Sequence, residues 1–312
     1  MTIAQSTDHS TRDSSAQLST SVMITRKNAV PLDVFYDYWG DIHGVLAARG
    51  DGVAYYWQHR FGAALPDFFR VPSTVSQAVP LGDPIVGMAE ITFETPEGRG
   101  ALIGSAVAGQ MVMDEQNVLK GTYMYSTGPG NAVTLLDRFE SNAPQGAPDG
   151  YSVMTFIRQA ENVSVDQFRS FVRELAGELS KTPGVMKVRF HLLEAYDSAA
   201  WPTPNVDHDR AADQQYQAYM ELAFDKQADA TAVAIVNTLS PLADRIQKAV
   251  SALTTYPTFQ KNTMRYAGRP TVAGLRGLSA LRTLTAIGDP ANEKALPMLR
   301  LIFGDAVLQP TV

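Results

Sequence analysis

The sequence predicts an α+β protein made of two tandem β-α-β-β-α-β units followed by a helical tail. Three observations carry this prediction. The apolar spacing of a helix that begins near residue 31 returns 133 residues later, and the strand-like segments after it return at offsets of 131 and 132. A segment rich in proline and glycine, "SNAPQGAPDG" at 141–150, separates the two copies. Internal repetition is examined first because it determines how the rest of the chain is divided.

The first helix of each unit is predicted by apolar residues three and four positions apart, which lie on one helical face. In the first copy they are Leu32, Phe35, Trp39, Ile42 and Leu46. In the second copy they are Val165, Phe168, Val172, Leu175 and Leu179.

Strand-like and helical segments then follow in the same order in both copies. The strand pairs are "GVAYYWQHRF" (52–61) with "GVMKVRFHLL" (184–193), and "MAEITF" (88–93) with "YMELAF" (219–224). Further strands are expected at 21–25 and 151–157 and at 121–126 and 261–268, with second helices over 97–119 and 226–253. This order is the ferredoxin-like unit, whose antiparallel sheet carries both helices on one face. The bare face needs a partner, so we expect the two sheets to pack face to face as an α/β barrel. The halves could instead pair between chains and give a homodimer.

The predicted organisation has five parts. They are a disordered lead (1–20), the first half (21–140), a linker (141–150), the second half (151–268) and a C-terminal helical tail (269–312). Each half also carries an insertion between its second and third strands, at about 62–86 and 195–215. Loops of this length are often functional, so both are expected to be lids over the cavity between the sheets.

Composition excludes several classes of function. The 312 residues carry a net charge of −6, which argues against nucleic acid as a partner. The absence of cysteine excludes disulfides, thiolate metal sites and cysteine nucleophiles. No apolar run is long enough to cross a membrane, and the Ser- and Thr-rich start has no signal-peptide core, so we expect a cytoplasmic protein.

Two matching glutamates are the clearest candidates for chemistry. Glu90 and Glu221 alternate with the apolar residues of their strands, so both should point away from the helices and into the barrel. In an apolar cavity, burial would raise the pKa of a carboxyl group and allow it to act as a general acid or base near neutrality. The alternative is a glutamate at the barrel mouth or one paired with an arginine.

Two matching histidines lie on the neighbouring strands. His59 and His191 occupy the same position in the two copies, and the apolar pattern of the second copy turns His191 toward the cavity. The first copy is ambiguous, because a shift of one residue exchanges the two faces of a strand. Either Tyr55, Trp57 and His59 face inward, or Tyr56, Gln58 and Arg60 do.

The first half resembles the EthD family of dimeric α/β-barrel proteins. The resemblance rests on "RKNAVPLDVFYDYWGDIHG" followed by "GVAYYWQHRF". The second half is similar through "VSVDQFRSFVRELAGEL" and "TPGVMKVRFHLLE", but Ala176 stands where His43 would be. The resemblance implies two facing sheets with a cavity between them. Related barrels act as cyclases, dehydratases, isomerases, monooxygenases or haem-binding proteins.

These observations combine into one functional hypothesis. We expect a lyase or isomerase without cofactor or metal that acts on an apolar or aromatic small molecule. Glu90, His43 and His59 are the expected catalytic residues, and the expected substrate-binding residues are Tyr56, Trp57, Arg60, His191 and Glu221. His43 could instead seal the end of its helix. Two alternatives stay open: a haem protein with His191, His59 or His43 as the axial ligand, or a ligand-binding protein without catalysis.

Overall fold

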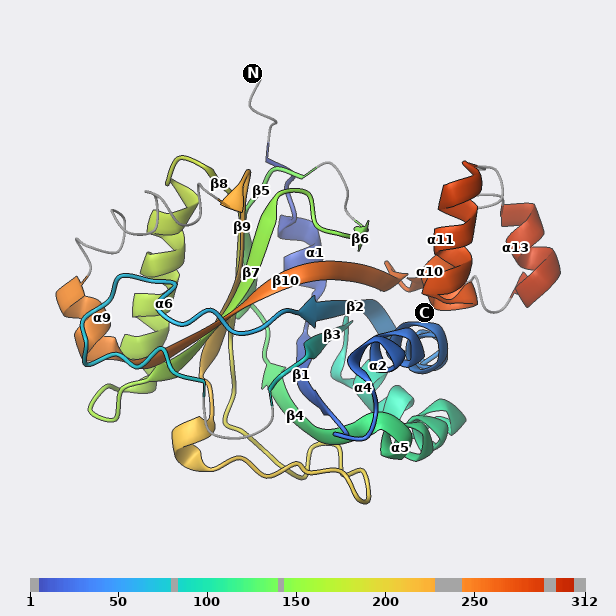
Figure 1. Cartoon of the computed structure of the whole chain (residues 1–312), viewed down its shortest axis with the longest axis horizontal. Coiled ribbons are helices and arrows are strands. Elements are labelled where there is room, and N and C mark those ends of the chain that lie inside the picture. The colour runs from blue at the N-terminus through green and yellow to red at the C-terminus, as the bar shows by residue number, and fades with distance from the viewer. Residues whose placement is uncertain (1–5, 80–83, 140–142, 228–242, 289–295, 306–312) are drawn as a thin grey trace.

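The protein is an α+β structure dominated by one large antiparallel sheet (Figure 1). A computed structural model describes residues 6–79, 84–139, 143–227, 243–288 and 296–305. The main strands are β1 (Leu18–Arg26), β2 (Val53–Phe61), β3 (Gly87–Phe93), β4 (Leu119–Thr127), β5 (Ala132–Asp137), β7 (Tyr151–Gln159), β8 (Val185–Leu192), β9 (Ala218–Phe224) and β10 (Val250–Tyr266). The two-residue strands β6 (Gln145–Gly146) and β11 (Arg269–Pro270) pair with β10.

The strand order is β4-β1-β3-β2-β10-β7-β9-β8-β5. The four strands from the first half and the four from the second therefore follow the same spatial order, fourth-first-third-second. The halves are joined edge to edge, because β2 and β10 pair antiparallel. The second helix expected for the second half lies mostly on 228–242, outside the described residues. Among the described residues, α9 (Ala243–Ala249) falls within the expected range.

Strand β10 differs from the expected pattern. The helix expected over 226–253 gives way at Val250 to a strand of 17 residues, which includes the strand expected at 261–268. Its first part pairs with β7 from Val250 to Thr258, and its second part pairs with β2 from Thr258 to Arg265. Four threonines and two tyrosines give it the β-branched and aromatic composition of a strand.

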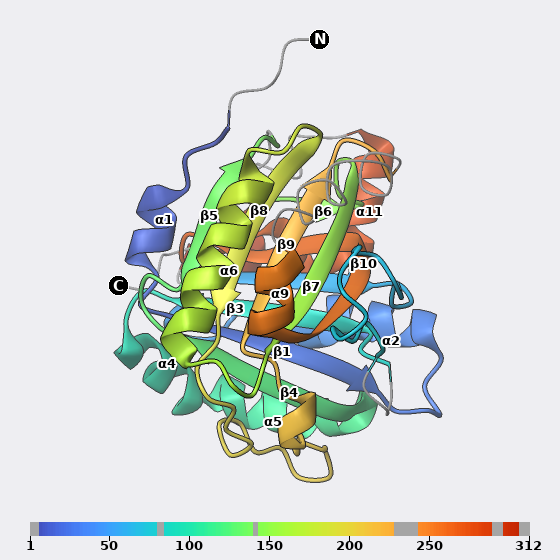
Figure 2. The same ribbon diagram turned by 90° about the vertical axis from the view of Figure 1, so that its left-hand side faces the viewer.

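The two halves of the curved sheet face each other. One buried cluster contains Met23 and Met88 from the first half with Met154 and Phe156 from the second. The Ser21 hydroxyl also lies 2.8 Å from the Tyr219 hydroxyl across the interface. The outer faces carry the helices, with α6 (Val165–Ser180) and α9 over the second half (Figure 2). The first half carries α2 (Leu32–Tyr38), α3 (Gly44–Ala47), α4 (Pro96–Ile103) and α5 (Ala106–Val118).

The first helix of the first half is interrupted. Between α2 and α3 the chain forms one π-helical turn, η1, over Trp39–His43. Gly44 follows this turn directly, and a Cβ there would lie 2.9 Å from the Trp39 carbonyl oxygen, so a larger residue would force the backbone to shift. The matching helix α6 is continuous and begins with a capping box made by Ser164 and Gln167.

The N-terminal segment is ordered from residue 6, which contradicts the expected disordered lead. Residues Ser10–Ser15 form α1, and β1 begins at Leu18. Asp13 explains the order, because its carboxylate accepts hydrogen bonds from Arg189 and from the backbone N–H of Thr134. These charge-assisted bonds fasten α1 to the second half.

The insertions cover the space between the sheets only in part, where Ile85 and Tyr196 pack on the buried cluster between the halves. Each insertion also lies over the helical side of the other half. Phe69 and Val75 of the first insertion belong to the core between α6 and its sheet. Trp201 and Val206 of the second insertion pack on the core of the first half.

The described residues of the tail include the short helices α10 (Val272–Arg276), α11 (Leu278–Ile287) and α13 (Leu296–Phe303). Ala273 and Leu278 pack on the first half's helices. The start of the tail also lies against β10, where the Thr271 N–H donates to the Met264 carbonyl. None of the described helices is long and apolar enough to cross a membrane.

Candidate functional site

The residues expected to form one site lie on opposite faces of the first-half sheet. Ala89 and Ile91 line a cavity beneath the helices, and His43 lines the same cavity. Glu90, between them on β3, points to the other face and contacts Arg189 of the second half. The expected grouping of Glu90 with His43 is therefore not present, because adjacent residues of a strand face opposite ways.

Glu90 lies at the centre of a buried charged cluster between the two halves. Its carboxylate is 2.9 Å from an Arg189 nitrogen, 3.3 Å from Nε2 of His191 and 3.6 Å from Nε2 of His59. Burial alone would raise the pKa of Glu90, but Arg189 and the histidines outweigh burial and hold it well below its usual value. The expectation of a raised pKa was wrong, because the surroundings of Glu90 are charged rather than apolar.

Glu221 occupies the matching position and is held by lysines. Its carboxylate accepts hydrogen bonds from Lys261 at 2.7 and 3.0 Å, and Lys187 lies 3.3 Å away. Burial is outweighed by the two lysines, so the pKa of Glu221 also lies below its usual value. Burial lowers the pKa of Lys261 to about 8, against the opposing effect of Glu221.

This cluster has little free space. Beside Glu90 and Trp57 the cavity measures about 20 Å³, closed on one side by His9 and Arg12 of the N-terminal segment. That volume holds about one water molecule. The cluster therefore joins the two halves electrostatically and leaves no room for a substrate.

Strand β2 resolves the ambiguity of its two faces. His59 faces Glu90, Trp57 lies beside Lys261, and Tyr55 stacks on Trp57. These three residues therefore point toward the space between the halves. Arg60 points to the helices and donates to the Tyr36 carbonyl. Both rings of the inner pair, His59 and His191, are fully buried, and burial lowers the pKa of each.

The second polar region is the cavity between the first-half sheet and its helices. Its free volume is about 40 Å³. Its lining is mostly apolar, and its polar members besides the Trp201 indole are Thr20, His43, Tyr56, Arg99, Glu115 and Thr122. A mostly apolar hollow with a few convergent polar groups is the usual form of a small-molecule site.

His43 is oriented in this cavity by a carboxylate. Its Nδ1 lies 2.8 Å from Asp114 of α5, which also accepts a hydrogen bond from the Tyr38 hydroxyl. Burial raises the pKa of Asp114, but the hydrogen bonds from His43 and Tyr38 outweigh burial and hold it below the usual value. An ionised carboxylate only accepts, so Nδ1 carries the proton. Nε2 is then the basic nitrogen, and none of the described residues forms a hydrogen bond with it.

Tyr56 supplies a donor to the same cavity. Its hydroxyl oxygen accepts a hydrogen bond from Gln58 at 2.8 Å, which leaves its own O–H available. Burial raises the pKa of Tyr56 well above its usual value, so the phenol stays protonated. A base and a neutral acid thus line one hollow.

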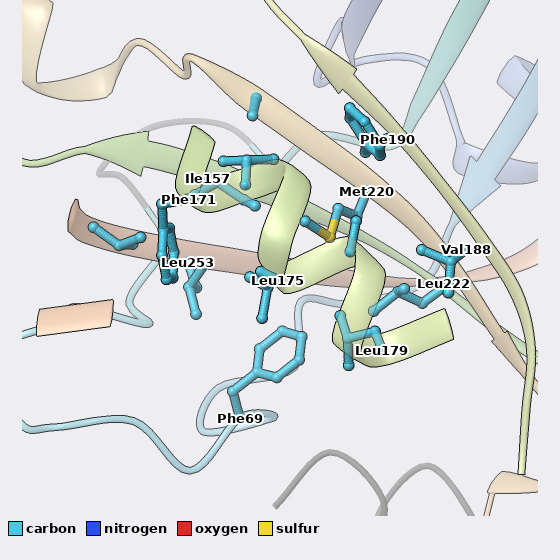
Figure 3. Close-up of a cluster of buried hydrophobic side chains, with 14 of the residues drawn as sticks. Phe69, Ile157, Phe171, Leu175, Leu179, Val188, Phe190, Met220, Leu222 and Leu253 are labelled. Carbon is cyan, nitrogen blue, oxygen red and sulfur yellow. The ribbon is translucent and has the colours of Figure 1, made fainter. Parts of the chain in front are cut away.

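The matching region of the second half has no such groups. Its cavity of about 10 Å³ is lined by aliphatic residues, Met220, Phe69 and a single hydroxyl, that of Thr155. Figure 3 shows Phe69 beside Leu175 and Leu179 of α6. Ala176, at the position of His43, is fully buried.

Neither histidine site has space for a haem in the closed form of the structure. His59 and His191 lie against Glu90 in a space of about 20 Å³, and His43 faces about 40 Å³. Ligand pockets of cofactor size are roughly 300 Å³ or more. Among the described residues, no group of three or more His, Asp or Glu side chains is placed to hold a metal ion.

Sequence reasoning missed Asp114, Tyr38, Glu115 and Trp201. Asp114 is 71 residues from His43 and occupies an ordinary helical position, so no local signal marks it. Trp201 did have a signal, because it lies 132 residues after Phe69 and the two insertions correspond at that offset.

Comparisons with known proteins identify a shared fold. No protein-family model matches the chain, and no curated protein matches it. A solved anthrone oxidase-like protein is similar at a TM-score of 0.50 and 10% identity, over 79% of this chain and 92% of that chain. Two proteins described as candidate monooxygenases give TM-scores of 0.46 (Fusobacterium nucleatum subsp. nucleatum, 6% identity) and 0.42 (Lactobacillus acidophilus, 9% identity). They cover 82% and 80% of this chain and 97% of each of those chains. At such low identity, the likeness to the anthrone oxidase-like protein shows the fold and not the chemistry.

Proposed function

We propose that the protein is a cofactor-independent lyase or isomerase that acts on a small apolar or aromatic carbonyl compound in the helix-side cavity of the first half. The proposal rests on the contact between His43 Nδ1 and Asp114 at 2.8 Å, on the wall of a mostly apolar cavity. A carboxylate that fixes the tautomer of a histidine leaves the other ring nitrogen as a general base.

The proposed chemistry uses one base and one donor. His43 Nε2 removes a proton from the carbon next to the substrate carbonyl, and the Tyr56 O–H donates to the carbonyl oxygen as it becomes an enolate. The proton on His43 then returns to a different carbon in an isomerisation, or to a departing hydroxide in a dehydration. The Asp114 carboxylate stabilises the imidazolium between these two steps.

The same proposal covers the finer assignment of the fold. We assign the chain to a tandem ferredoxin-like duplication of EthD type, in which only the first copy keeps the site. The equal strand orders of the halves and the reciprocal position of their insertions support this assignment. We assign the role of general base, which the sequence suggested for Glu90, to His43 instead, because Glu90 lies in the charged cluster between the halves.

The test is proton exchange, which requires no knowledge of the natural product. Purified protein is incubated in D₂O with a panel of aryl ketones and β-dicarbonyl compounds, and deuterium incorporation is followed by NMR. We expect exchange with at least one compound and its loss in His43→Gln. Tyr56→Phe should lower the exchange rate less than His43→Gln does.

Two results would contradict the proposal. Exchange that persists unchanged in His43→Gln would remove the assigned base. An absorption band near 400 nm that purifies with the protein and disappears in His43→Gln would replace the lyase with a haem protein.

A further inference from the structure

The walls of the helix-side cavity are of two kinds. The sheet contributes β1 to β4, and the helical layer contributes η1, α4 and α5. Among the described lining residues, Trp201 alone belongs to neither a helix nor a strand. It comes from the insertion of the second half, which runs below β4 and α5 in Figure 1.

The closed cavity is too small for the ligands that its lining suits. About 40 Å³ accommodates about one water molecule, whereas pockets for small organic ligands measure about 300 Å³ or more. A wall must therefore move before a substrate enters. Sheet and helices are fixed by backbone hydrogen bonds and core packing, which leaves the Trp201 segment as the wall that can open.

Side-chain hydrogen bonds hold this segment closed. The Trp201 indole N–H donates to both oxygens of Glu115, at 3.1 and 3.2 Å, and the Thr203 hydroxyl donates to the same carboxylate. Arg99 donates to the Ala200 carbonyl at 3.1 Å. Glu115 and Arg99 belong to the first half, so the second half closes the cavity of the first.

The ends of the segment are fixed by backbone contacts. Asp207 exchanges two backbone hydrogen bonds with β4, accepting from Thr122 and donating to Lys120, each at 2.9 Å. At the other end, the Glu194 N–H donates to Ser126 at 2.8 Å. Tyr196 and Val206 pack on buried clusters just inside these anchors. Residues 197–205 therefore form the span that can swing while both ends stay in place.

We propose that residues 197–205 are the gate of the helix-side cavity and that Trp201 sets the size of the ligand it admits. This inference rests on the proposed ligand site in the first half, but it does not depend on the reaction performed there. The ligand class is a flat, uncharged aromatic molecule, because Trp201 closes an otherwise mostly apolar hollow.

Binding of N-phenyl-1-naphthylamine, whose fluorescence rises in apolar surroundings, tests the gate by stopped-flow mixing. In the wild-type protein we expect an association rate that levels off at high probe concentration, because opening limits entry. Trp201→Phe keeps the aromatic wall but loses the N–H donor, and should raise the limiting rate about ten- to a hundredfold, the equivalent of one hydrogen bond to a carboxylate. In Trp201→Ala the association rate should rise with probe concentration without reaching a plateau, and the variant should bind the probe at least tenfold more tightly.

Phe69→Ala is the matched control, since Phe69 closes the corresponding hollow of the second half. Its probe kinetics should equal those of the wild type, and circular dichroism establishes that each variant is folded. Unchanged kinetics in both Trp201 variants, or the same change in Phe69→Ala, would overturn the gate. Probe kinetics of the Trp201 variants report the gate, and proton exchange in His43→Gln reports the proposed reaction, so failure of one leaves the other standing.

Discussion

The two halves of this protein cover the same side of similar sheets in different ways. In the second half, the continuous helix α6 presents Leu175, Ala176 and Leu179 to the sheet and fills the space, leaving about 10 Å³. In the first half, the π-helical turn over Trp39–His43 interrupts the helix, and about 40 Å³ remains beside His43. The comparison teaches that a local change in helical winding can separate a packed core from a core with a cavity. π-Helical turns are frequent at functional sites.

The insertions show the same contrast. Phe69 enters the second half as an apolar plug, with only 5% of its surface exposed. Trp201 is half-buried and is tied by its N–H to a carboxylate. The Phe69 ring contributes packing alone, whereas the Trp201 ring can be released by breaking its hydrogen bonds to Glu115.

The largest expected effect is on catalysis. His43→Gln should lower the rate of the proposed reaction by about 10²–10⁴, the usual loss for a general base. The matched Phe69→Ala should leave the rate per folded molecule unchanged. Equal losses in the two variants would mean that the halves are not divided as described.

The next effect concerns the charged cluster. Glu90→Gln should lower the free energy of unfolding by about 3 kcal/mol, the low end for breaking a buried ion pair, because Arg189 keeps Asp13 as a partner. Glu221→Gln should lower the free energy of unfolding by about the same amount at pH 7. At pH 9 the loss should be smaller, because Lys261, with a pKa of about 8, can then lose its charge. Urea unfolding at the two pH values measures the difference. A cost for Glu221→Gln that does not change with pH would contradict this account.

The same cluster gives stability a pH dependence. The pKa values of His59 and His191 are lowered in the folded state, so below pH 6.5 the unfolded chain takes up protons that the folded chain does not, and stability falls. Below pH 4.5 the depressed pKa of Glu90 adds to the loss, because its stabilisation is full above the pKa of the unfolded chain and is lost as the pH falls toward the pKa in the folded state. In Glu90→Gln the decline below pH 4.5 should be shallower, and an unchanged slope would assign the decline to other carboxylates.

A smaller difference is expected between the two insertion contacts. Phe69→Ala should lower the free energy of unfolding by about 3 kcal/mol, as for a buried phenylalanine. Trp201→Ala should cost about 1 kcal/mol, because the ring is half-buried and already borders free space. Calorimetric melting of the two variants gives the comparison. A larger loss for Trp201→Ala would make its segment a structural element rather than a movable one.

The smallest effect is expected at Tyr38. Tyr38→Phe removes one of the two hydrogen bonds that orient the Asp114 carboxylate and should lower the rate about two- to tenfold, the equivalent of 0.5–1.5 kcal/mol. Its pH–rate profile should shift as well, because Asp114 acts through His43. A lower rate with an unshifted profile would assign Tyr38 to packing.

Much of the fold was predictable, and the grouping of the site residues was not. Strict alternation in β3 and β9 indicated that Glu90 and Glu221 point away from the helices. Alternation could not orient β2, because all nine of its residues are buried and both faces carry large side chains. The pairing of His43 with Asp114 depends on how α5 packs against η1, and no spacing in the sequence encodes that contact. The helix expected over 226–253 was wrong from Val250 onward. There the chain forms strand β10, which is stabilised by pairing with β7 and β2, and these pairings join residues far apart in the sequence.

Strand β10 also has a consequence for how the chain folds. Among the described strands it is the last long one to be synthesised, and β7 and β2 each pair with it. Until then, the edge of "VAYYWQHRF" has no partner beyond β3, and an unpaired strand of that composition is prone to join other chains. The two halves therefore do not complete their sheets one after the other during synthesis. Both are completed together, when a single late segment pairs with the two open edges.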